Sequence, residues 1–123
     1  MATGTIPTWA DHLWNGEKSG GDTISVPERW KNYRFLAFRL SHYSYGSSIL
    51  FIKVYTSENP VVMFLMSGQA ASSTIQTITM TGTLDTSTNV LTLGSQLACN
   101  QTSSGNSIFS TNNMKITDIY GID

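Results

Sequence analysis

Apolar and polar side chains alternate along most of this chain with a period of two, which is the pattern of β-strands. The stretch "GGDTISVP" puts Ile24 and Val26 on one face and ends at a proline. In "YRFLAFRL", Leu36, Phe38 and Leu40 share one face. No segment keeps a 3.6-residue apolar period for three turns, so the sequence predicts strands and turns throughout.

Three of the predicted strands have apolar side chains on both faces. They are "YRFLAFRL", "SSILFIKVY" and "VVMFLM", and the turn "TSENP" between the last two predicts an antiparallel hairpin. A two-layer sandwich covers only one face of each sheet. The second apolar face predicts a homo-oligomer, with a trimer as the preferred state. The candidate contact residues are Phe35, Ile49, Phe51, Val62 and Phe64.

A second hairpin is predicted from "SSTIQTITMTGTLD" and "TNVLTLGSQLA" around the turn "DTSTN". The inward positions are Ile78, Met80, Leu84, Leu91, Leu93 and Leu97, and the outward positions are Thr77, Thr79, Thr81 and Thr92. The following "CNQTSSGNS", which leads into "IFSTNN", is rich in Ser, Asn and Gly and is predicted as a loop.

The chain end, "ITDIYGID", is unusually apolar for a terminus. Ile116 and Ile119 are three apart, which a helix would align, but seven residues rich in β-branched side chains make a poor isolated helix. We predict a terminal strand with both faces covered, which also buries Ile122.

Together these elements predict an all-β protein, an antiparallel β-sandwich or jelly roll of about eight strands. The length of 123 residues fits one domain, 1–123, in which residues 1–12 form an N-terminal arm. Ser and Thr supply roughly a quarter of the chain, a composition that favours strands over surface helices.

Charge and hydropathy exclude several classes of partner. The formal net charge is -1 and there is no Lys/Arg run, so no nucleic acid partner is expected. No run approaches the roughly 18 apolar residues of a membrane span, and the start lacks a signal-peptide pattern, so membrane insertion is not expected. Cys99 is the only cysteine, which excludes an internal disulfide.

No motif for catalysis or metal binding is readable in the chain. His12 and His42 lack paired ligand spacing and are interpreted as surface histidines. No nucleophile elbow is present. The acids Glu17, Glu28, Glu58 and Asp85 fall in predicted turns, where solvated charge is the ordinary reading. We therefore expect no enzyme activity, no metal and no cofactor.

A family resemblance rests on three segments in order, "LWNGEKSGGDTISVP", "NYRFLAFRL" and "ITDIYGI". They resemble the small β-domains at the ends of bacteriophage tail-fibre and head-fibre proteins, from about Leu13 to Ile122. Asn15 and Asp118 depart from the family pattern. The resemblance implies a virion protein, made in the host cytoplasm and often trimeric, that attaches to a host surface component.

Two function classes follow. The first is a fibre or spike module that binds a host cell-surface glycan or protein; the second is a structural virion protein, such as a head-decoration or fibre-assembly domain, that contacts other virion proteins and has no receptor. A carbohydrate-binding module attached to an enzyme is less favoured, because no partner domain is visible.

The candidate binding residues lie in predicted turns. The loop "SHYSYGSS" carries His42, Tyr43 and Tyr45, whose rings suit the faces and hydroxyls of a sugar. The alternative is that these rings pack over the end of the sandwich. Three further candidates with stacking or amide groups are Trp30, Asn100 and Asn112.

Overall fold

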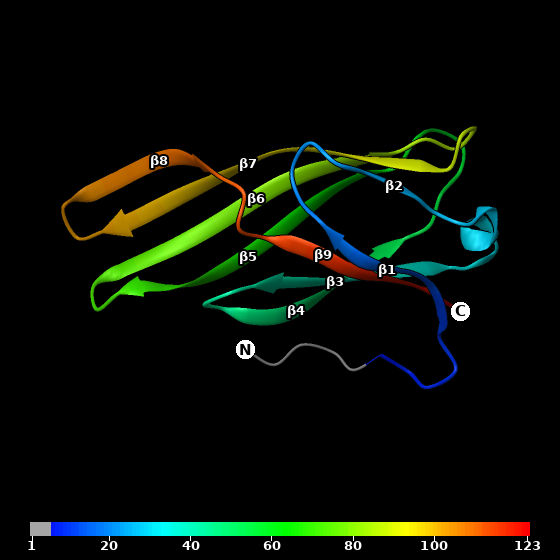
Figure 1. Cartoon of the computed structure of the whole chain (residues 1–123), viewed down its shortest axis with the longest axis horizontal. Helices are drawn as coiled ribbons and strands as arrows, with labels where there is room; N and C mark the ends of the chain where they lie inside the picture. The colour runs from blue at the N-terminus through cyan, green and yellow to red at the C-terminus, as the bar shows by residue number, and fades with distance from the viewer. Residues whose placement is uncertain (1–5) are drawn as a thin grey trace.

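The protein is a sandwich of two antiparallel β-sheets in a computed structural model that describes residues 6–123 (Figure 1). The predicted all-β sandwich is confirmed, with nine strands in the described residues. The elements are β1 (Asp11–Lys18), β2 (Thr23–Ser25), the 3-10 helix η1 (Glu28–Asn32), β3 (Phe35–His42), β4 (Gly46–Lys53), β5 (Val61–Ala71), β6 (Thr74–Leu84), β7 (Val90–Thr102), β8 (Gly105–Thr111) and β9 (Lys115–Ile122).

The first sheet, sheet A, has the strand order β1-β9-β3-β4, and the second, sheet B, has the order β2-β7-β6-β5 with β8 also paired to β7. β2 pairs with the start of β7 at Val90–Thr92, and β8 pairs with its far part at 96–102. β6 pairs with one edge of β7, so β2 and β8 both pair with the other edge and follow one another along it.

The core is the apolar layer between the two sheets. Phe38 of β3 meets Phe64 of β5 edge to face, with ring centroids 5.1 Å apart. Around this pair lie the buried side chains Ile24, Leu36, Leu40, Val62, Met66, Ile78, Met80, Leu84, Leu91, Leu93, Ile116 and Ile119. Burial of one such side chain contributes roughly 1.5–3 kcal/mol, so this layer is the main source of stability.

The apolar chain end is a buried strand, as predicted. β9 lies between β1 and β3, and Ile116, Ile119 and Ile122 are all buried. Asp118 pairs with Arg39 and Ile116 with Leu40, so Thr117 is an extra residue in β9. This bulge explains how two isoleucines three apart both reach the core.

Two predictions about connections are wrong. β4 and β5 do not form a hairpin; they belong to different sheets, and the segment between them crosses from one sheet to the other. There the Asn59 Oδ1 accepts hydrogen bonds from Thr86 N–H and hydroxyl, 2.9 and 3.0 Å, which ties the crossing to the β6–β7 turn. The predicted loop after Ala98 is instead the end of β7 and all of β8. This hairpin extends past sheet A, so no opposing layer requires its side chains to alternate between apolar and polar, and the alternation that marks a strand is missing from its sequence.

Other differences concern single positions. Leu97 faces outward because the β6–β7 register shifts between Met80 and Gly82, and Gln96 takes the inward place. The proposed arm at 1–12 overlaps β1, since His12 already pairs with Tyr120. Residues 1–5 of the arm lie outside the described residues.

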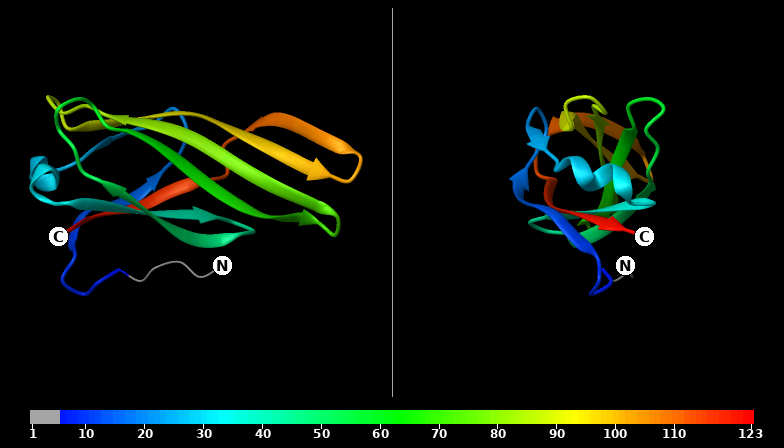
Figure 2. Two further views of the ribbon diagram at one scale, coloured as in Figure 1. Left: turned by 180° about the vertical axis from the view of Figure 1, so that it is seen from behind. Right: turned by 90° about the vertical axis from the view of Figure 1, so that its right-hand side faces the viewer.

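The two sheets differ in length. β5, β6 and β7 have 11, 11 and 13 residues, whereas β3 and β4 have 8 each. The β5–β6 and β7–β8 hairpins therefore reach well past the β3–β4 turn (Figures 1 and 2). The inner side of sheet B is uncovered there, and the β3–β4 turn lies where this uncovered part begins.

Truncation after Asn113 should abolish folding. It removes β9, and with it the backbone pairing of both β1 and β3 and three buried isoleucines, a loss comparable with the roughly 5–15 kcal/mol that stabilises a domain. The measurement is thermal unfolding by circular dichroism. Truncation after Ile122, which removes only the exposed Asp123, is the control and should melt cooperatively. Cooperative melting of the longer truncation would contradict the role assigned to β9.

Candidate ligand-binding site

Three aromatic rings stack at the β3–β4 turn. His42 ends β3 and pairs with Gly46, the first residue of β4, whose φ of 77° suits glycine. The His42 ring lies 4.6 Å from that of Tyr43 and 4.2 Å from that of Tyr45, nearly parallel to both. Tyr43 is 83% exposed and forms the outer layer of the stack.

His42 is fixed in one tautomer, and it is buried, so its interpretation as a surface histidine is wrong. Its Nδ1 accepts hydrogen bonds from the backbone N–H of Ser44, 3.0 Å, and of Tyr45, 3.3 Å. The proton of the neutral ring is therefore on Nε2, which is buried and has no partner within residues 6–123. Burial lowers the pKa of His42.

Tyr45 joins the turn to sheet B. Its ring packs against Gly68 of β5, where a side chain would overlap it. Its hydroxyl donates to Gln76 Oε1, 2.9 Å, and Gln76 Nε2 donates to Asn100 Oδ1, 2.9 Å. This chain of hydrogen bonds crosses β6 to β7 and brings two of the candidate residues, Tyr45 and Asn100, into one polar network.

A hollow of about 290 Å³ lies on the other side of the stack. Two of its walls are His42 and Tyr43, and Glu17, Ser41, Asn113 and Lys115 complete it. Glu17 was expected in a turn, but it is on β1. The hollow thus combines a flat ring with a carboxylate, an ammonium, an amide and a hydroxyl, which can bind a polyhydroxylated ligand.

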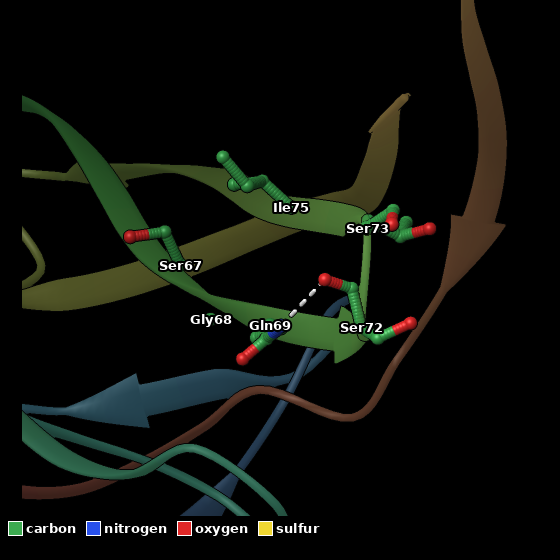
Figure 3. Close-up of a pocket in the computed structure, with 7 residues that line it drawn as sticks. Ser67, Gly68, Gln69, Ser72, Ser73 and Ile75 are labelled. Carbon is green, nitrogen blue, oxygen red and sulfur yellow. Dashed lines mark hydrogen bonds between the residues drawn. The ribbon is translucent and has the colours of Figure 1, made fainter. Parts of the chain in front are cut away.

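The ends of the two long hairpins are also hollowed. The β5–β6 end has a hollow of about 500 Å³ lined by Ser67, Gly68, Gln69, Ser72, Ser73, Thr74 and Ile75 (Figure 3). Gln69 Nε2 donates there to the Ser72 carbonyl, 3.0 Å, so its amide is already engaged. The β7–β8 end has a hollow of about 270 Å³ that includes Asn100. Neither hollow contains an aromatic side chain.

Two other candidate residues lie apart from the stack. Trp30 cannot be a ligand contact: η1 buries it in the core, and its Nε1 donates to Asn89 Oδ1, 3.0 Å. Asn112 lines a separate hollow between the β1–β2 turn, β7 and β8, where its Oδ1 accepts the Gly20 N–H, 2.8 Å. The neighbouring Asn113 is the asparagine beside Tyr43.

Of the candidate oligomer contacts, Phe35 and Phe51 are exposed on the outer face of sheet A and Ile49 is half-buried there. Val62 and Phe64 are in the core, so they cannot form an intersubunit contact. The exposed face of β5 is the opposite one, with Val61, Met63 and Leu65. The alternation was correct, but the sequence did not say which face is inside.

Sequence reasoning missed Gln76, Asn113 and Lys115. Gln76 stands among threonines as the single long amide of β6, and that irregularity was the only available signal. Asn113 and Lys115 carried none, because their position depends on how β9 enters sheet A.

Among residues 6–123, no group of three or more His, Cys, Asp or Glu side chains is arranged to hold a metal ion. No helix in that range is long and apolar enough to cross a membrane. No family model, curated protein or solved structure matches the chain.

Lowering the pH from 7 to 5 should lower the melting temperature. The folded state holds His42 with a lowered pKa, so its contribution is complete above the unfolded pKa of about 6.5 and is lost as the pH falls toward the folded value. Asp11 and Asp85, whose pKa values are lowered by the Arg29 guanidinium and by the Ser87 hydroxyl respectively, act only below about pH 4.

The comparison is between His42→Gln, which should flatten this dependence, and the exposed control His12→Gln, which should keep it. If the pH dependence of the melting temperature disappeared in His12→Gln and persisted in His42→Gln, its assignment to His42 would be wrong.

Gly68→Ala should destabilise the protein by about 1–3 kcal/mol, because the new methyl group overlaps the Tyr45 ring and forces it away from Gln76. Urea unfolding measures the change. Ser67→Ala, on the outward side of the same strand, is the control and should lie within about 0.5 kcal/mol of the parent. Equal stability of the two variants would contradict the close packing of Tyr45 on β5.

Proposed function

We propose that this protein is an attachment module that binds a host surface glycan through the stack of His42, Tyr43 and Tyr45 and the hollow beside it. The observation that carries the proposal is the exposed Tyr43 ring, held flat by His42 at the rim of a polar hollow. A single exposed aromatic ring is ordinary on a protein surface, so the support comes from the combination of this ring with the polar groups of the hollow at its edge.

The chemistry of the hollow supports a sugar ligand. The apolar face of a pyranose ring stacks on tyrosine, and its hydroxyls need both acceptors and donors at the edge. Glu17 supplies acceptors, Lys115 supplies donors, and Asn113 supplies both. The stack is preorganised by the two backbone hydrogen bonds to His42, which reduces the entropy lost on binding.

The virion setting of the proposal rests on the resemblance of "LWNGEKSGGDTISVP", "NYRFLAFRL" and "ITDIYGI" to phage fibre domains. In that setting the module is placed on a tail or head fibre. The alternative, a structural virion protein without a receptor, predicts no glycan affinity. Binding, and not folding, therefore separates the two.

Binding of the purified protein to a glycan array, followed by titration of any positive glycan, tests the proposal. Tyr43→Ala should weaken binding roughly tenfold or more, about 1.4 kcal/mol, because the stacking surface is lost. Its melting temperature should change little, since the Tyr43 side chain is exposed. Tyr45 is not a suitable test position, because its loss also disrupts packing on Gly68.

Trp9→Ala is the matched control, an exposed aromatic residue outside the stack, and should bind like the parent. A folded parent protein that binds no glycan supports the structural alternative. Parent-like binding by a folded Tyr43→Ala protein would show that the site lies elsewhere.

A further inference from the structure

Charge is distributed very unevenly along this chain. The chain has seven basic and eight acidic residues. Between Val61 and Met114 the only one of them is Asp85, in the β6–β7 turn, and the other fourteen lie outside that stretch. β5, β6, β7 and β8 all fall within it. β2 is also uncharged, so the strands of sheet B carry no ionisable Lys, Arg, Asp or Glu, whereas sheet A carries many.

The outer face of sheet B is apolar as well as uncharged. On β5, Val61, Met63 and Leu65 point outward and are 64%, 56% and 50% exposed. The exposed Leu97 of β7 and Ile108 of β8 border the other side. Between them runs a row of outward threonines on β6, formed by Thr77, Thr79, Thr81 and Thr83. We call these residues the uncharged face.

Such a face is uncommon on a surface that stays in water. Charged residues make up 12% of the whole chain but Asp85 is the only one between Val61 and Met114, and depletion of charge is the feature that marks the centre of a protein interface. The border strand β5 adds to this, because no strand within residues 6–123 pairs with its outer edge, and it has neither a charge nor a proline to protect that edge.

The outer face of sheet A is different. It mixes Phe35 and Phe51 with Lys53 and with Arg39, which lies 3.4 Å from the Asp118 carboxylate. Such a mixture of apolar and charged side chains is ordinary for a sheet face in contact with water. The apolar surplus that predicted self-association is therefore concentrated on sheet B, and not at Phe35, Ile49 and Phe51.

We propose that the uncharged face binds the same face of a second copy of this chain. A partner with a charged side chain in the contact would have to bury that charge unpaired, which is costly. The uncharged face of a second copy has no charged side chain to bury. Threonine hydroxyls both donate and accept, so two identical rows can satisfy each other. The interface is thus self-complementary, as a two-fold contact requires.

The size of the face fits this occupant. Strands of 11 residues at about 3.3 Å each and four strands at about 4.8 Å give a face of roughly 35 by 19 Å. This is close to the ~800 Å² per partner of a standard stable interface. Two outer faces of twisted sheets pack well when aligned, as the layers of a sandwich do.

Analytical ultracentrifugation of the full chain between 1 and 100 µM tests the proposal. The parent should sediment as a dimer, and Met63→Lys should sediment as a monomer with unchanged circular dichroism, because the added charge would be buried between two copies. Phe51→Lys is the matched control, an exposed apolar residue on the outer face of sheet A, and should remain a dimer.

Thiol labelling gives a second readout that does not depend on mass. Cys99 lies on the uncharged face, paired with Thr77 and Ile108, and is half-buried within the single chain. Its reaction with a small disulfide reagent should be at least tenfold slower in the parent than in Met63→Lys at 100 µM.

A monomeric parent at 100 µM overturns the proposal, as does dissociation by Phe51→Lys but not by Met63→Lys. Cys99 labelling that is equally fast in the parent and in Met63→Lys would show that any oligomer uses another surface. These results are independent of glycan binding, because Tyr43 lies at the β3–β4 turn and Met63 on the outer side of β5.

Discussion

The apolar layer between the sheets is the interaction on which the rest of the structure depends. Phe38 and Phe64 meet at its centre, and every strand of both sheets except β8 contributes an apolar side chain to it or packs against it. The layer ends where sheet A ends. Because β5, β6 and β7 continue, the same sheet that supplies half of the core also supplies an uncovered inner surface beyond it.

The β3–β4 turn closes the core at this boundary, and the closure explains the unusual chemistry of its rings. Tyr45 is held by Gly68 and by the hydrogen bonds through Gln76 to Asn100, and His42 is buried behind it. Tyr43 has no such neighbour and is exposed. Tyr45 therefore connects the turn to sheet B, His42 covers the end of the core, and Tyr43 is exposed. The packing alternative holds for Tyr45 and His42, and the binding alternative concerns Tyr43 alone.

The period-two pattern was sufficient to predict the sandwich and the β6–β7 hairpin. The apolar chain end predicted the burial of Ile116, Ile119 and Ile122, but not the bulge that brings Ile116 and Ile119 to the same face. The period-two pattern could not predict which sheet a strand joins, so β4 and β5 were paired wrongly, nor which face of β5 is inside. The pattern failed for β8, because no layer of sheet A lies opposite that strand. It also failed at Leu97, because a bulge reverses the alternation there. The site was partly predictable, since aromatic residues in a turn are visible in sequence, but Gln76 and Asn113 approach them only through the fold.

The central place of β9 has a consequence for synthesis. Of the described strands, β1 is made first and its neighbour β9 last, so Asp11 can meet Gly121 only after the whole segment between them has been made. Contacts so distant in sequence form slowly. The uncharged strands β5 to β8 leave the ribosome before β9, and their hairpins have only neighbours in sequence to pair with. During that interval their apolar sides are open to other nascent chains, and a chaperone that covers them until the eight residues of β9 emerge would raise the yield of folded protein.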